Sequence, residues 1–283
     1  MSNPYCIHTY WAMYGFADFL RGTIAIYYFC KKYNYDLYID TSSSSIFNYL
    51  NINNKYVLQS HIKHDSEQVK FYKYNNPGML YPEIYIKLEE TFKEGKSFVV
   101  STNSMYKLGS NGIPMYWGDL EYDCKQFMKE ILQPVTLINN QIQNVFNNVY
   151  NIKENEPFKV IHIRCGDNFH KEFSNEEYLR FHNQICKYIE NDKDINYVLV
   201  CDNIYLGNNL SKNIPLLKYW ENIKGHTGVL KGTKNNDAMI NTVCDYFILS
   251  MASELLPLGP NGSGFSLSTS LIFGSKLKNV RNI

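Results

Sequence analysis

One apolar run of the sequence, FKVIHI (residues 158–163), is followed at once by residues that can bind an anion. Arg164 carries a planar guanidinium that can fork onto two phosphate oxygens. Gly166 has no side chain, so a ligand can approach its backbone closely. In open α/β sheets, ligands bind beyond the carboxyl ends of the strands. The pattern predicts a phosphate-type site, and it also fits a buried arginine–aspartate ion pair that holds a loop at the end of the strand.

A second candidate is the run NGSGFS, residues 261–266, which precedes an apolar, helix-like segment. Gly262 and Gly264 permit tight turns. The hydroxyls of Ser263 and Ser266, together with the backbone N–H groups at the start of a helix, can form an anion site. An ordinary capped turn has the same composition, so this alternative stays open.

Two further segments have the form of known motifs. The run GFADFLRG, which begins at Gly15, is similar to a glycine loop but lacks the patterns of a P-loop and of a dinucleotide-binding fingerprint. Asp192 and Asp194 form a D-x-D pattern, whose two carboxylates can hold a divalent metal ion. They lie in a polar connection between a helix and a strand, so we interpret them as a solvated loop and predict no metal site.

The elements that must position these residues alternate between strand and helix. Strands are predicted at 6–10, 36–40, 97–101, 158–163 and 197–201, and a short apolar run lies at 255–258. Helices are predicted at 18–32, 119–148 with a break near Pro134, 238–251 and 267–274. Another helix begins at Ser174, which forms a capping box with Glu177, and runs to about residue 190. A polar, asparagine-rich stretch at 147–156 separates the two halves. We predict an α/β fold with two Rossmann-like domains, residues 1–150 and 151–283.

Composition excludes several classes of protein. The chain has 283 residues, 45% hydrophobic and 19% charged, which is typical of a folded globular protein. A formal net charge of +1 gives no electrostatic reason to expect a nucleic-acid partner, and no apolar run approaches the length of a membrane span. Seven cysteines without a C-x-x-C pair argue against a zinc ribbon and a disulfide framework. We expect a cytoplasmic protein.

The order of these motifs resembles the fucosyltransferase superfamily, which includes α1,2-, α1,6- and protein O-fucosyltransferases. The matching segments are HIRCGD (162–167) and DYFILSMASELLPLGPNGSGFS (245–266), with a weaker match over residues 15–40. The chain departs from the family at Cys165, where a second arginine is frequent, and at Ala17, where a second glycine is usual.

The resemblance implies a GT-B-like pair of α/β domains that face a cleft, with GDP-fucose bound by the C-terminal domain. Arg164 would grip the donor diphosphate, His162 would contact the nucleotide, and Asp245 would accept hydrogen bonds from guanine. The remaining residues of the implied donor site are Gly15, Gly166, Ser263, Gly264, Phe265 and Ser266. The acceptor would be a glycan or a glycoprotein, and no cofactor is implied.

We therefore predict an inverting, metal-independent fucosyltransferase that displaces GDP directly from the anomeric carbon. Arg164 and backbone amides at a helix N-terminus would neutralise the charge that grows on the diphosphate. Asp18 is the predicted base for the acceptor hydroxyl, and Asp167 is the alternative. Two other functions stay open: a transferase of the same fold with another nucleotide sugar, and a relative that binds a glycan or nucleotide without turnover.

Overall fold

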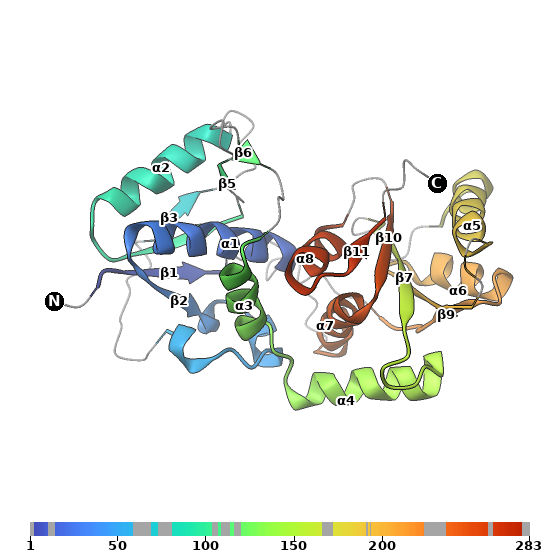
Figure 1. Cartoon of the computed structure of the whole chain (residues 1–283). Helices are drawn as coiled ribbons and strands as arrows, with labels where there is room; N and C mark the ends of the chain where they lie inside the picture. The colour runs from blue at the N-terminus through green and yellow to red at the C-terminus, as the bar shows by residue number, and fades with distance from the viewer. Residues whose placement is uncertain are drawn as a thin grey trace. The chain divides into compact units, whose positions relative to one another are not determined.

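The structure is a computed structural model that describes residues 3–10, 15–58, 69–72, 81–103, 107–108, 114–115, 120–165, 172–190, 192, 194–223, 236–259 and 263–278. The contacts of these residues divide into two compact units, one up to Gln133 and the other from Pro134 onward (Figure 1). The predicted domain boundary at residue 150 stays a prediction. No helix in the described ranges is long and apolar enough to cross a membrane.

The N-terminal unit is built on a parallel sheet with the strand order β2-β1-β4-β3. Its strands are β1 (Tyr5–Thr9), β2 (Asp36–Asp40), β3 (Val69–Tyr72) and β4 (Phe98–Thr102). A separate antiparallel pair consists of β5 (Lys107–Leu108) and β6 (Pro114–Met115). Short 3₁₀ turns at Thr41–Ser43, Ser45–Tyr49 and Asn54–Tyr56 follow β2. The parallel pairing of β1 with β2 confirms the predicted strand–loop–helix–strand opening.

Three helices of this unit pack through aromatic side chains. They are α1 (Phe16–Tyr33), α2 (Tyr81–Lys93) and α3 (Tyr122–Ile131). Phe29 of α1 stacks on Phe92 of α2 with ring centroids 5.1 Å apart, and Tyr27 of α1 stacks on Phe127 of α3 at 4.7 Å. Stacked aromatic side chains therefore hold these helices together.

Helix α1 lies unusually close to β4 at Gly22. A Cβ atom at Gly22 would lie 1.8 Å from the carbonyl oxygen of Thr102, so no larger residue fits without a backbone shift. His8 of β1 is fully buried beside this contact, and its Nδ1 lies 3.1 Å from Oγ1 of Thr23. Burial lowers the pKa of His8 to about 3, so the imidazole is neutral at physiological pH and belongs to the core.

The C-terminal unit contains a five-stranded parallel sheet with the order β11-β10-β7-β8-β9. Its strands are β7 (Phe158–Ile163), β8 (Asn196–Cys201), β9 (Leu217–Tyr219), β10 (Glu254–Leu258) and β11 (Lys276–Leu277). Its helices are α4 (Thr136–Val145), which continues into a π-helical turn at Phe146–Tyr150, α5 (Asn175–Glu190), α6 (Ile204–Asn213), α7 (Asn236–Met251) and α8 (Gly264–Phe273).

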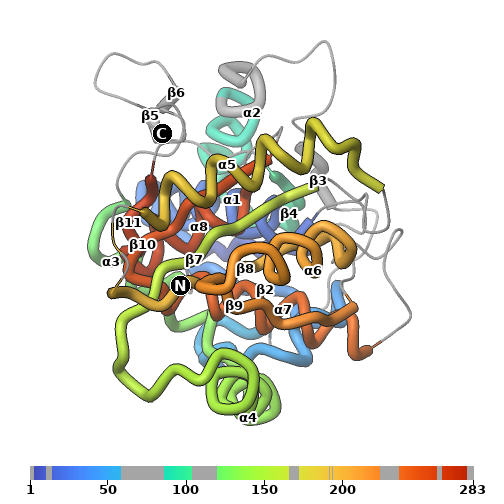
Figure 2. The backbone as a smooth tube through the Cα atoms, turned by 90° about the vertical axis from the view of Figure 1, so that its right-hand side faces the viewer, coloured from blue at the N-terminus to red at the C-terminus, as the bar shows by residue number. Residues whose placement is uncertain are grey.

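Helices cover both faces of this sheet (Figure 1). On one face, α5 and α6 bury apolar residues such as Phe181 and Leu210 against Ile161 and Leu199 of the strands. Figure 2 views the unit from this side, with α5 and α6 in front of β7 and β8. On the other face, α8 contacts β10 and packs against α7, which in turn contacts α4. This doubly wound arrangement confirms the predicted α/β class.

Local sequence signals place several elements correctly. The strand at 158–163 has both predicted ends, and Ser174 and Glu177 form the predicted capping box, with the Glu177 N–H donating to Ser174 Oγ at 3.2 Å and the Ser174 N–H to Glu177 Oε2 at 3.0 Å. The last helix is a correction: it begins at Gly264 rather than at 267, because Ser263 already acts as its N-cap.

Candidate active site

The strand order determines which side chains meet at the carboxyl edge of the C-terminal sheet. β7 lies between β10 and β8, with Ile163 opposite both Leu258 and Cys201. Arg164 follows β7 directly, and Asp202 follows β8. The residues after three adjacent strands therefore converge at this edge, which is where the ligand of an open α/β sheet binds.

Arg164 is held by the carboxylate of Asp202. Its Nη1 donates to Asp202 Oδ2, and the backbone N–H of Cys165 donates to Asp202 Oδ1 at 2.7 Å. The Asp202 side chain is 11% exposed, whereas that of Arg164 is 32% exposed. The ion pair left open as an alternative is thus present, with Asp202 as the acid. Because a guanidinium has five N–H donors, this pair orients Arg164 and still allows it to bind an anion.

A glycine after β10 permits this arrangement. Gly259 has a φ of +125°, and a Cβ atom there would lie 2.4 Å from the carbonyl oxygen of Arg164. The backbone N–H of Arg164 donates to the carbonyl oxygen of Leu258 at 3.0 Å. The end of β10 therefore presses on the backbone of Arg164 and fixes its position.

His162 and Ser266 meet on the face covered by α8. His162 Nδ1 lies 2.6 Å from Ser266 Oγ, and both side chains are buried. Ser263 caps α8, accepting a hydrogen bond from the Ser266 N–H at 3.4 Å, and Gly264 and Phe265 form the first turn. The predicted serine-rich anion site is therefore a helix N-terminus that begins beside the end of β7. Its backbone N–H groups and partial positive charge suit a phosphate.

Asp245 lies buried on α7, one residue before the Tyr246 side chain that packs edge-on against Phe265 at 5.2 Å. Burial raises the pKa of Tyr219, and the negative charges of the carboxylates of Asp245, Glu221 and Asp202 raise it further. Tyr219 is the last residue of β9. The charges of the Asp202 and Asp245 carboxylates both act on its hydroxyl.

Sequence reasoning missed Asp202 and Tyr219. Asp202 follows β8 and Tyr219 ends β9. Ligands of open α/β sheets bind beyond the carboxyl ends of the strands, and this rule, which identified Arg164, could have identified both residues.

The other predicted residues have different placements. Gly166 and Asp167 lie outside the described residues. Gly15 and Asp18 belong to the N-terminal unit, where the Gly15 N–H donates to Asp18 Oδ2 at 3.1 Å and Asp18 Oδ1 pairs with Arg21. Both carboxylate oxygens of Asp18 thus help to hold the start of α1. Its role as a base stays a prediction.

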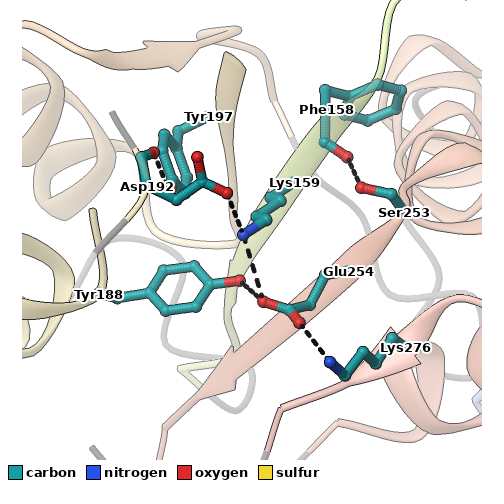
Figure 3. A network of polar contacts seen from close by, with 8 residues as sticks. All are labelled: Phe158, Lys159, Tyr188, Asp192, Tyr197, Ser253, Glu254 and Lys276. Carbon is teal, nitrogen blue, oxygen red and sulfur yellow. Dashed lines mark hydrogen bonds and ion pairs between the residues drawn. The ribbon is translucent and has the colours of Figure 1, made fainter. Parts of the chain in front are cut away.

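Asp192 of the D-x-D sequence takes part in a network of polar contacts (Figure 3). The network lies at the amino edge of the sheet, whereas Arg164 follows the carboxyl end of β7. Its Oδ2 accepts from Lys159 Nζ at 3.0 Å. Glu254, which begins β10, accepts a hydrogen bond from Tyr188 at 2.5 Å and pairs with Lys276 at 3.6 Å. This network joins the starts of β7, β10 and β11, so Asp192 has a structural role there.

No family model matches the chain, and no curated protein matches it. Solved structures do match. The fucosyltransferase NodZ from Bradyrhizobium has a TM-score of 0.60 at 12% identity, covering 96% of this chain and 93% of that one. A mutant of FUT1 from Arabidopsis thaliana in complex with GDP has a TM-score of 0.62 at 10% identity, covering 98% and 70%. POFUT1 in complex with GDP-fucose has a TM-score of 0.56 at 11% identity, covering 97% and 96%.

The chain thus shares the GT-B-like α/β fold of these solved fucosyltransferases. Each unit supplies a parallel sheet, and the likeness spans nearly the whole chain. The resemblance found in the sequence is confirmed at the level of the fold.

Proposed function

We propose that this protein is a metal-independent, inverting fucosyltransferase that uses GDP-fucose as its donor. The observation that carries the proposal is the guanidinium of Arg164, held by Asp202 at the carboxyl edge of β7. The structures with the same fold include NodZ soaked with GDP-fucose and POFUT1 in complex with GDP-fucose. A cation and a helix N-terminus at the same edge suit a nucleoside diphosphate.

The chemistry follows from the charge that leaves with GDP. As the bond to the anomeric carbon breaks, negative charge grows on the diphosphate, and Arg164 and the amides at the start of α8 would stabilise it. A hydroxyl of a glycan or glycoprotein attacks the opposite face, which inverts the configuration. Asp18 is the proposed base for that hydroxyl. We propose no cofactor.

None of the seven cysteines, all of which lie in the described ranges, forms a disulfide. This supports a reducing compartment such as the cytoplasm.

The test of the function compares nucleotides and turnover. Thermal-shift measurements with GDP, UDP, ADP and CMP should show the largest stabilisation with GDP, because a ligand that binds the native state raises its apparent stability. Release of fucose from GDP-fucose without an acceptor would show turnover. Binding of GDP without any hydrolysis or transfer would favour a non-catalytic relative, and preference for another nucleotide would favour a different donor.

Fucosyl transfer should survive EDTA at full rate. Asp192, the first aspartate of the D-x-D sequence, forms an ion pair with Lys159 at the amino edge of the sheet. Asp192→Asn should therefore keep the catalytic rate while costing at most about 1 kcal/mol of stability. Activity that disappears in EDTA and returns with Mn²⁺ would contradict the metal-independent mechanism.

Asp245→Asn should erase most of a preference for guanine. Guanine presents N1–H and the N2 amino group side by side, and one carboxylate can accept from both. An amide offers one acceptor in place of two. We expect the wild-type protein to bind GDP about tenfold or more tighter than UDP or ADP, a difference of about 1.4 kcal/mol, by calorimetry.

The matched control is Asp237→Asn on the exposed first turn of the same helix. This change should leave the preference intact. If Asp245→Asn keeps the full preference for GDP while remaining folded, the guanine assignment is wrong.

A further inference from the structure

Three side chains with ligand atoms for a soft metal converge where β7 and β8 end. Sγ of Cys165, Sγ of Cys201 and a carboxylate oxygen of Asp202 all lie within 4.8 Å of one another. The three residues are 6%, 0% and 9% exposed. Within the described part of the chain, this is the one group of three such ligand atoms at this spacing.

The donor set selects a class of metal. Thiolates favour soft or borderline ions such as Zn²⁺ and Cd²⁺ over Mg²⁺ and Mn²⁺. Zinc binds thiolate sulfur at about 2.3 Å in tetrahedral geometry, so two sulfurs on one ion stand about 3.8 Å apart. Ligand atoms already within 4.8 Å need to move by only a fraction of this distance to share an ion.

We propose that Cys165, Cys201 and Asp202 form an inhibitory binding site for a soft divalent metal ion, in which the metal competes with Arg164 for the Asp202 carboxylate. Asp202 Oδ2 accepts from Arg164, and Oδ1 accepts from the Cys165 N–H. Each metal–sulfur bond replaces the proton of a thiol, so two protons are released to the solvent as the ion binds. The metal–oxygen bond draws charge from the Asp202 carboxylate and so weakens its hydrogen bonds from Arg164 and the Cys165 N–H. Arg164 is then held less firmly by the group that orients it.

The effect on donor binding rests on the proposed function, whereas the metal site itself does not. An ion bound at this site would inhibit the protein, whereas the reaction we propose uses no metal ion. Removal of metal with EDTA therefore leaves the enzyme active or raises its activity.

The chain supplies two matched controls. Cys6 and Cys30 form a second pair of neighbouring buried thiols, joined by a hydrogen bond, in the N-terminal unit. Cys186 lies on α5 with its Sγ 3.8 Å from both ring nitrogens of His182. Neither belongs to a group of three close ligand atoms in the described ranges. Each offers a thiol that the proposal excludes from the site.

The first experiment titrates the full chain, reduced with a phosphine that does not chelate metals, with Cd²⁺. The thiolate-to-cadmium absorption in the ultraviolet and equilibrium dialysis report binding. We expect one tight ion per chain, and a loss of affinity of about tenfold or more in Cys165→Ser and in Cys201→Ser. Asp202→Asn, which keeps the shape of the side chain, should also weaken binding. Circular dichroism establishes that each variant is folded.

Cys30→Ser and Cys186→Ser should bind Cd²⁺ as the wild type does. Tight binding that persists in the folded Cys165→Ser and Cys201→Ser variants would overturn the proposed site, and so would its loss in Cys186→Ser. Should a cysteine variant fail to fold, Co²⁺ bound to the wild type provides the second measurement. Absorption bands of a tetrahedral, thiolate-ligated cobalt support the site, and an octahedral spectrum without sulfur bands contradicts it.

The second experiment measures GDP affinity with and without one equivalent of Zn²⁺. The ion should weaken GDP binding about tenfold or more in the wild type and leave Cys165→Ser unchanged. Because Zn²⁺ also binds free GDP, the difference between the two proteins carries the result. Equal effects in both would overturn the competition for Asp202. Failure of the wild type to bind GDP without metal would contradict the proposed function, while the cadmium titration still decides the metal site.

Discussion

Replacing Arg164 by lysine is expected to weaken GDP binding by about 3 kcal/mol or more, a loss of more than about a hundredfold. Lysine keeps the charge but cannot reproduce the planar fork of a guanidinium. At this position the side chain must pair with Asp202 and also reach the diphosphate. One ammonium cannot satisfy both in a fixed geometry. Isothermal titration calorimetry of Arg164→Lys and Arg164→Ala measures the effect.

Arg180 provides the control for this change. It lies exposed on α5, with its guanidinium 5.1 Å from the centre of the Phe181 ring, so Arg180→Lys should bind GDP as the wild type does. Asp202→Asn should lose part of the affinity, because the amide keeps the shape of the acid while removing the charge that orients Arg164. Wild-type affinity in Arg164→Lys would contradict the diphosphate role.

Gly22→Ala is expected to lower the free energy of unfolding by about 3 kcal/mol. Alanine is the better helix former by about 1 kcal/mol, so helix propensity alone predicts the opposite sign. The added Cβ atom would lie 1.8 Å from the carbonyl oxygen of Thr102 at the end of β4 and 3.1 Å from Nε2 of His8. The helix or the strand must therefore shift. Urea denaturation followed by circular dichroism measures the loss.

Gly207→Ala in α6 is the matched comparison, because the gain in helix propensity is the same. There the Cβ atom would meet the Tyr219 ring, with the nearest atom at 2.4 Å. A side chain can move more easily than the backbone at the end of a strand, so we expect a smaller loss of stability. A Gly22→Ala variant as stable as the wild type, or no less stable than Gly207→Ala, would show that α1 can move away from β4.

Local patterns predicted the elements whose signals lie within a few residues. The strand at 158–163 is a continuous apolar run, which is typical of a strand buried on both faces of a parallel sheet. Ser174 and Glu177 cap each other across three residues. These features depend on neighbours in the chain, so they can be identified without knowledge of the fold.

Elements whose stability comes from packing escaped the sequence analysis. Helix α6 contains a glycine, three asparagines and a serine, all poor helix formers, so propensity gives little signal. Its buried Leu206 and Leu210 pack in the core of the C-terminal unit and stabilise it there. The short strand β9 ends at Tyr219, and this segment forms a strand only because it pairs with β8.

The sequence by itself determined that Arg164 follows a buried strand and that a serine-capped helix begins near the C-terminus. Only the tertiary structure decided what these residues meet. Asp202 comes 38 residues after Arg164, and Ser266 comes 104 residues after His162. Both contacts exist because β7 lies between β8 and β10 in the sheet. Strand order depends on long-range packing of apolar faces, and residue spacing along the chain does not encode it.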